Sequence, residues 1–219
     1  MTDPVVIETA SAPTGSIIWL HGLGADGHDF EPIVPELRLP DSLSLRFVFP
    51  HAPVRPVTVN GGMAMRAWFD IRDFGKAGVP DIEGIEASCA TLDAFVEAEI
   101  ERGVPRHRIV LAGFSQGGVI AMHTALRSHE PLAGLLALST WLPLSDRLAS
   151  YPDHASLPVF MAHGQFDPML PLPMGMASRD AIRSAGLDPE WQEYPMAHAV
   201  CPQEIADISR WLQSVYNAE

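Results

Sequence analysis

The sequence has few cysteines, little basic charge and no long uninterrupted apolar run. Two cysteines, Cys89 and Cys201, are too few for a disulfide framework. Fourteen basic against 27 acidic residues give a net charge of −13, which argues against a nucleic-acid groove or an anionic membrane as the main partner. No stretch approaches the roughly 20 apolar residues of a membrane span, and no basic n-region of a signal peptide is seen. These absences predict a reduced, cytoplasmic protein without stable membrane insertion.

The chain also lacks an internal repeat, a low-complexity tract and a linker that would divide it. Its 219 residues, of which 47% are hydrophobic, can bury a substantial core. We therefore expect a single domain over residues 1–219.

Short apolar runs recur along the chain. Four of them, at residues 16–21, 108–113, 135–139 and 159–163, are nearly continuous in apolar residues. That pattern is typical of strands buried on both faces of a parallel sheet. Further strands are expected at residues 5–9, 45–49 and 191–194.

Helical patterns lie between these runs. Apolar residues recur at spacings of three and four from 85 to 100, with Asp81 as the expected N-cap and Gly103 as the stop. A second pattern, at 205–215, begins after Pro202, and a shorter one covers 30–37. The alternation predicts an α/β fold, with a mostly parallel central sheet and helices on both faces.

Residues 51–80 do not fit the alternation. The segment begins with prolines and glycines and shows no sustained period, yet it holds many apolar residues. A connection of this length inside a compact domain is usually functional. We interpret it as an irregular, cap-like segment beside the site, with ordinary surface packing as the alternative.

Gly113-Phe114-Ser115-Gln116-Gly117 lies between an apolar strand pattern and an apolar helix pattern. Gly-x-Ser-x-Gly in this context resembles the nucleophile elbow of α/β-hydrolases. The serine at such a tip is strained, and glycines two residues before and after it relieve a mutual clash. A chance match in a glycine-bearing loop is the alternative, so the rest of the chain has to supply a base and an acid.

The residues that follow the other strands supply both. Ligands of open α/β sheets bind beyond the carboxyl ends of the strands, where Asp167 and His198 are expected. The chain order Ser115, Asp167, His198 is that of α/β-hydrolases. Asp146 and Asp153 are rival acids in surface segments, and His21 and His163 also end strands.

The loop after residues 16–21 matches G-x-G-x-x-G through Gly22, Gly24 and Gly27. A dinucleotide site further requires a carboxylate at the end of the next strand, and none is present there. We therefore interpret the loop as part of an oxyanion hole, with the Leu23 and Gln116 amides as donors. The sequence has no HExxH, zinc-spaced Cys/His pair or phosphate loop, which predicts hydrolysis without a cofactor or a metal.

These segments together resemble the phospholipase/carboxylesterase family of α/β-hydrolases, which includes bacterial carboxylesterases and acyl-protein thioesterases. The resemblance runs from residue 17 to about 212. It rests on His21-Gly22-Leu23-Gly24-Ala25-Asp26-Gly27, on the elbow, and on the segments at 65–71, 138–143, 164–168 and 194–198. It implies Ser115 as nucleophile, Asp167 as acid and His198 as base, with the Leu23 and Gln116 amides as donors.

The resemblance further implies an apolar acyl pocket. We expect it to be lined by Leu23, Phe74, Trp141, Met169 and Leu170, although the last two are equally compatible with an ordinary core. One departure from the family pattern is Ala197, where glycine is frequent before the histidine.

The sequence therefore predicts a serine carboxylesterase for short to medium acyl chains. The alternatives are an acyl-protein thioesterase or lysophospholipase and, more remotely, a non-catalytic binding module. The expected partner is a small ester or thioester or an acylated protein, with no nucleic acid. Apolar residues in segment 51–80 are compatible with a homodimer.

Overall fold

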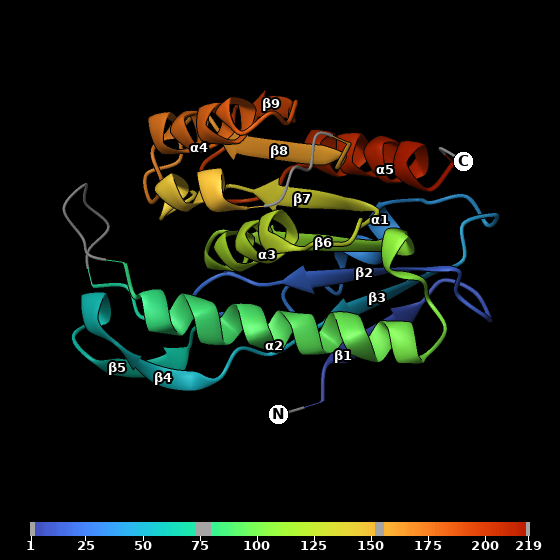
Figure 1. Ribbon diagram of the computed structural model, residues 1–219, viewed down its shortest axis with the longest axis horizontal. Coiled ribbons are helices and arrows are strands. Elements are labelled where there is room, and N and C mark those ends of the chain that lie inside the picture. Colours follow the sequence, from blue (N-terminus) through green and yellow to red (C-terminus); the bar gives the residue numbers. More distant parts are fainter. Residues whose placement is uncertain (1–2, 73–79, 152–155, 218–219) are drawn as a thin grey trace.

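The computed structural model describes residues 3–72, 80–151 and 156–217 and is built on a seven-stranded sheet (Figure 1). The strand order is β1-β3-β2-β6-β7-β8-β9. β1 is antiparallel to β3, and every other neighbouring pair is parallel. The strands are β1 (Val5–Glu8), β2 (Gly15–Leu20), β3 (Leu45–Phe49), β6 (Ile109–Phe114), β7 (Gly134–Leu138), β8 (Val159–Gly164) and β9 (Glu190–Tyr194). All seven predicted strands are present.

The four nearly continuous apolar runs form the centre of this sheet. β2, β7 and β8 are buried at every residue, and β6 at every residue but the last. Successive side chains alternate between two hydrophobic clusters: Ile18 and Leu20 of β2 lie in one, Ile17 and Trp19 in the other. A strand in that position needs apolar residues at all positions, which is why the runs do not alternate with polar residues.

Helices cover both faces of the sheet (Figure 1). α2 (Ile82–Glu101), α3 (Gln116–Arg127) and α4 (Leu172–Ser184) contribute to the cluster that holds Leu20. α1 (Ile33–Glu36) and α5 (Pro202–Asn217) contribute to the other. The predicted fold class is thus confirmed. None of the helices in the three described ranges is long and apolar enough to cross a membrane.

Two predicted helix starts agree with the structure, and one predicted helix is shorter than expected. The Asp81 side chain accepts a hydrogen bond from the Gly84 amide at 3.2 Å, as expected of the N-cap of α2. α5 begins at Pro202, also as predicted. The pattern at 30–37 is wrong in extent: only Ile33–Glu36 is helical, because Pro32 and Pro35 have no N–H with which to extend the helix toward residue 30.

Segment 51–80 contains more regular structure than its sequence predicts. β4 (Val54–Val57) and β5 (Met63–Arg66) form an antiparallel hairpin, joined through a 3-10 turn (η1, Thr58–Asn60) and two glycines with positive φ. The irregular assignment was wrong here because both strands are largely exposed and lack an alternating apolar face. Phe74 lies outside the described residues.

The parallel strands end at one edge of the sheet, where the residues expected to be functional gather. In Figure 1 the arrows of β2, β7 and β8 point toward the side of the β4–β5 hairpin. The elbow, the glycine loop and the loops after β8 and β9 all follow strand ends at this edge.

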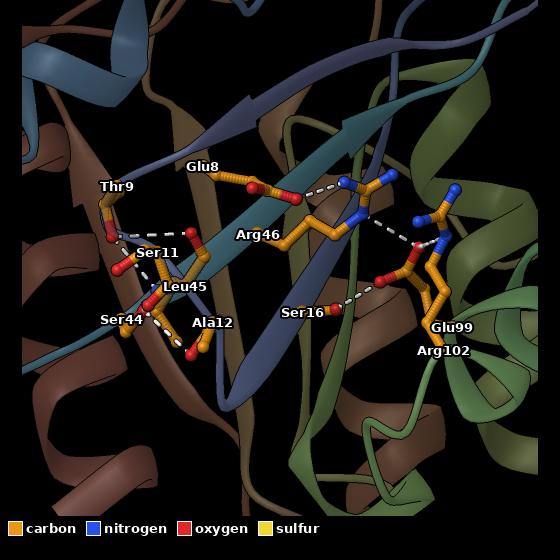
Figure 2. Close-up of polar contacts among 10 residues, drawn as sticks. All are labelled: Glu8, Thr9, Ser11, Ala12, Ser16, Ser44, Leu45, Arg46, Glu99 and Arg102. Atoms are coloured by element: carbon orange, nitrogen blue, oxygen red, sulfur yellow. Dashed lines mark hydrogen bonds and ion pairs between the residues drawn. The ribbon is translucent and has the colours of Figure 1, made fainter.

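A buried ion-pair network stabilises the region where the first strands meet α2 (Figure 2). Glu99 of α2 is 3% exposed and accepts hydrogen bonds from Ser16 Oγ at 2.6 Å and Arg46 Nε at 3.1 Å. Arg46 also pairs with Glu8. Ser16 lies near the start of β2, so the network lies at the end of the strand opposite to the glycine loop.

We predict that Glu99→Gln lowers the free energy of unfolding at pH 7 by about 3 kcal/mol, because it leaves a largely buried Arg46 without its inner charge partner. Urea unfolding measures the loss. Glu101→Gln, at an exposed position of the same helix, is the control and should change stability by no more than about 0.5 kcal/mol. Equal effects of the two substitutions would contradict the role of the network.

Candidate active site

Ser115 lies at a sharp turn between β6 and α3. Its backbone has φ 53° and ψ −120°, a strained conformation for a residue with a side chain. The Ser115 amide donates to Leu138 O at 2.9 Å, and Thr140 Oγ1 donates to Ser115 O at 2.7 Å. These bonds to the end of β7 and the residues beyond it hold the strained turn in place.

The two motif glycines serve different contacts. A Cβ on Gly113 would lie 2.4 Å from the Gly117 carbonyl carbon, so the predicted crowding is present on the Gly113 side. A Cβ on Gly117 would instead lie 2.4 Å from Leu20 O. Gly117 therefore lets the start of α3 approach the end of β2, and this brings the glycine loop next to the elbow.

Asp167 and His198 form a hydrogen-bonded pair. His198 Nδ1 lies 2.6 Å from Asp167 Oδ2, and Asp167 Oδ1 accepts the amides of Met169 and Leu170, each at 2.9 Å. The Asp167 side chain has no exposed surface, whereas that of His198 is 19% exposed. The two amides thus fix the carboxylate on the side away from His198, and the partly exposed imidazole is the member of the pair that faces the cavity.

His163 is the rival partner of Asp167. Its Nε2 lies 3.8 Å from Asp167 Oδ2 but only 2.7 Å from Leu170 O, to which it donates. Burial lowers the pKa of His163, which keeps the ring neutral. His163 is 1% exposed and is not among the cavity-lining residues, so of the two histidines only His198 meets Ser115 across the cavity.

One expected oxyanion donor comes from the glycine loop and the other from the elbow itself. Leu23 follows β2, and Gln116 is the first residue of α3. Within the described residues, neither backbone amide is paired with an acceptor. The Gln116 side chain accepts the Trp68 amide at 2.8 Å and donates to Phe69 O at 2.7 Å, which ties the elbow to segment 51–80.

A cavity of about 350 Å³ joins these parts. Ser115, His198, Leu23, Met169 and Leu170 all line it. Met169 is 48% exposed and Leu170 is 2% exposed, so they lie at the rim and in the wall respectively. Trp141 is not among the lining residues. Its ring packs against that of Phe69, with the two ring centroids 6.0 Å apart.

Several lining residues were not predicted individually. They are Gly22, Ala25, Asp29, Asn60, Met65, Ile71 and Phe114. Three of these come from segment 51–80, whose length and apolar content were the only signal. Asp29 had no sequence signal of its own. Partial desolvation and the neighbouring Asp26 carboxylate raise its pKa.

Comparisons with known proteins find relatives that match almost the whole chain. The family model described as Phospholipase/Carboxylesterase matches residues 1–216. Acyl-protein thioesterase 1 of Cryptococcus neoformans is 37% identical over 225 residues, which cover 94% of each chain. The protein of the same name from Gibberella zeae is 37% identical over 96% of this chain and 94% of its own.

Solved structures show the same fold. SOBER1 of Arabidopsis thaliana superposes with a TM-score of 0.87 at 29% identity, over 93% of this chain and 99% of its own. Acyl-protein thioesterase 2 of Zea mays gives a TM-score of 0.86 at 26% identity, over 98% and 99% of the two chains.

The strain at Ser115 predicts an unusual order of stabilities. Ser115→Gly should be about 1 kcal/mol more stable than Ser115→Ala, because glycine adopts positive φ without steric cost. Chemical denaturation of both variants measures the difference. At Ser214, exposed within α5, the order should reverse by about the same amount. Alanine as the more stable residue at both positions would show that the elbow is unstrained.

Proposed function

The chain belongs to the phospholipase/carboxylesterase family, and from that premise we propose that it is a carboxylesterase for short to medium acyl chains, acting through an acyl-enzyme on Ser115. The family and the named relatives make it a serine hydrolase, which rules out the non-catalytic binding module. The observation that carries the proposal is the Asp167–His198 pair, whose imidazole lines one cavity with Ser115.

The reaction proceeds in two acyl transfers. The Ser115 Oγ proton passes to His198 Nε2 as Oγ bonds the substrate carbonyl carbon. The oxyanion accepts hydrogen bonds from the Leu23 and Gln116 amides. His198 then gives the proton to the alcohol oxygen as the bond from that oxygen to the carbonyl carbon breaks. Water, deprotonated by His198, then attacks the acyl carbon, and Ser115 Oγ leaves with the proton.

Asp167 acts through His198 in both steps. The bond from His198 Nδ1–H to Asp167 Oδ2 leaves Nε2 unprotonated and ready to accept a proton. The carboxylate charge stabilises the imidazolium that forms. Because Asp167 Oδ1 is held by two amides, the imidazole needs no reorientation during turnover.

The cavity supports the substrate class. Its volume of about 350 Å³ lies near the lower end of the roughly 300–1,000 Å³ of ligand pockets. Leu23, Met65, Ile71 and Leu170 give it apolar walls suited to an alkyl chain. A short to medium chain fits such a volume better than a long one.

Thioester hydrolysis is the second candidate. It is favoured by the two relatives at 37% identity, both named acyl-protein thioesterase 1. The same nucleophile, base and oxyanion donors would cleave a thioester, with a thiolate as the leaving group. We propose a cytoplasmic location for either reaction, which the two free thiols support. A homodimer stays a prediction.

Loss of the acid should abolish turnover while leaving the fold intact. We predict that Asp167→Asn lowers kcat by about 10⁴-fold with little change in KM, because the amide favours the wrong imidazole tautomer. Asp146→Asn, at an exposed position, is the matched control and should behave as wild type.

A fluorophosphonate probe should label the wild type and fail to label Ser115→Ala. Labelling that survives this substitution would refute the proposed nucleophile.

The substrate class is tested by p-nitrophenyl esters of increasing chain length beside matched thioesters. The cavity volume predicts the highest kcat/KM for short to medium esters, with a decline for long chains. Ser115→Ala provides the background rate. A sharp preference for long-chain thioesters would instead establish the second candidate.

A further inference from the structure

His21 is a buried histidine at the junction of β2 and the glycine loop. It is 1% exposed, and both of its ring nitrogens have backbone partners. Nδ1 lies 2.7 Å from Gly22 O, and the Ala52 amide donates to Nε2 at 3.1 Å. The proposed reaction steps do not use this side chain.

The two partners fix the tautomer of the ring. A backbone amide can only donate, so Nε2 must be the unprotonated nitrogen; a carbonyl can only accept, so Nδ1 must carry the proton. In a charged ring Nε2 would also carry a proton, which would face the N–H of Ala52 instead of accepting a hydrogen bond from it. Burial lowers the pKa of His21 to about 4, against opposing effects of Gly22 and Asp26, so the ring is neutral at neutral pH.

The Gly22 carbonyl that accepts this proton belongs to the same peptide unit as the Leu23 amide. A trans peptide is planar, and its C=O and N–H point in opposite directions. A bond that fixes the direction of the Gly22 oxygen therefore also fixes the direction of the Leu23 N–H. It polarises the unit as well, which strengthens that amide as a donor.

Trp68 links this arrangement to the other donor. Its indole Nε1 donates to His21 O at 3.0 Å, and its backbone amide donates to Gln116 Oε1 at 2.8 Å. The Gly24 amide donates to Arg66 O at 2.8 Å on the same segment. One stretch of chain thus anchors the residues of both oxyanion donors.

We propose that His21 is a positioning residue of the oxyanion hole: its Nδ1–H, held by the Gly22 carbonyl, aims the Leu23 amide at the reacting carbonyl oxygen. The inference rests on the proposed acyl transfer at Ser115. His21 does not touch the substrate, and it acts through the Gly22–Leu23 peptide alone.

Two substitutions separate the two ring contacts. In His21→Asn the amide nitrogen takes the place of Nδ1 and keeps the donor to Gly22 O. In His21→Gln the amide reaches only the position of Nε2 and loses that donor. We expect His21→Gln to lower kcat by about 10–100-fold, and His21→Asn by less than about threefold, with KM nearly constant in both.

His123 offers a matched control. It is also buried and neutral, with a pKa lowered to about 4, and its Nε2 donates to Pro143 O at 2.9 Å. His123→Asn removes that bond about two helical turns along α3 from Gln116. It should reduce stability as His21→Gln does, yet keep kcat within about threefold of wild type.

The ratio of turnover on an ester to turnover on its thionoester measures how well the oxyanion donors bind the carbonyl oxygen. Sulfur accepts hydrogen bonds poorly, so a misaligned donor lowers the ratio, whereas a general loss of folded enzyme does not. His21→Gln should lower this ratio, and His21→Asn and His123→Asn should not. An unchanged ratio in folded His21→Gln overturns the inference; full turnover by Ser115→Ala instead overturns the proposed function.

Nuclear magnetic resonance of the ¹⁵N-histidine-labelled wild type tests the same inference without a substitution, in case His21→Gln does not fold. We expect His21 to be neutral with its proton on Nδ1 at pH 7, and this proton resonance to shift when a boronic acid analogue of the tetrahedral state binds. A proton on Nε2, or no response to the analogue, overturns the inference.

Discussion

The close approach of Gly113 to Gly117 determines the backbone of Ser115, and the rest of the site depends on that turn. With a Cβ at either glycine the chain would meet backbone atoms at 2.4 Å. The turn is strained at Ser115 itself, with φ 53°. It persists because bonds to Leu138 and Thr140 and the packing of α3, buried from Gln116 to Leu126, hold both its sides.

The same turn positions the surrounding parts. Gly117 lies against the end of β2, so the glycine loop begins beside Ser115. The Gln116 side chain reaches Trp68 and Phe69, so segment 51–80 is attached to the first turn of α3. The Asp167–His198 pair comes from two further strand ends at the same edge. The chemistry is concentrated there, whereas the Glu99 network stabilises the early part of β2 and β3.

The parts of the structure that sequence predicted well are those governed by local patterns. Strands buried on both faces appear as continuous apolar runs, and the Asp81 cap and the elbow carry their own spacing. The exposed β4–β5 hairpin gave no such signal, and prolines shortened the helix expected at 30–37. Contacts between distant segments, such as Asp29 beside the cavity or His21 beside Ala52, depend on the assembled sheet and were therefore not predictable.

In the proposed reaction, Ser115 attacks a carbonyl whose oxygen accepts hydrogen bonds from the Leu23 and Gln116 amides. A crystal structure of the fluorophosphonate adduct tests it most directly, since the phosphonyl oxygen occupies the place of the oxyanion. We expect phosphorus bonded to Ser115 Oγ, with that oxygen about 2.7–3.1 Å from both amide nitrogens. An adduct on another residue, or an oxygen directed away from both amides, would contradict it.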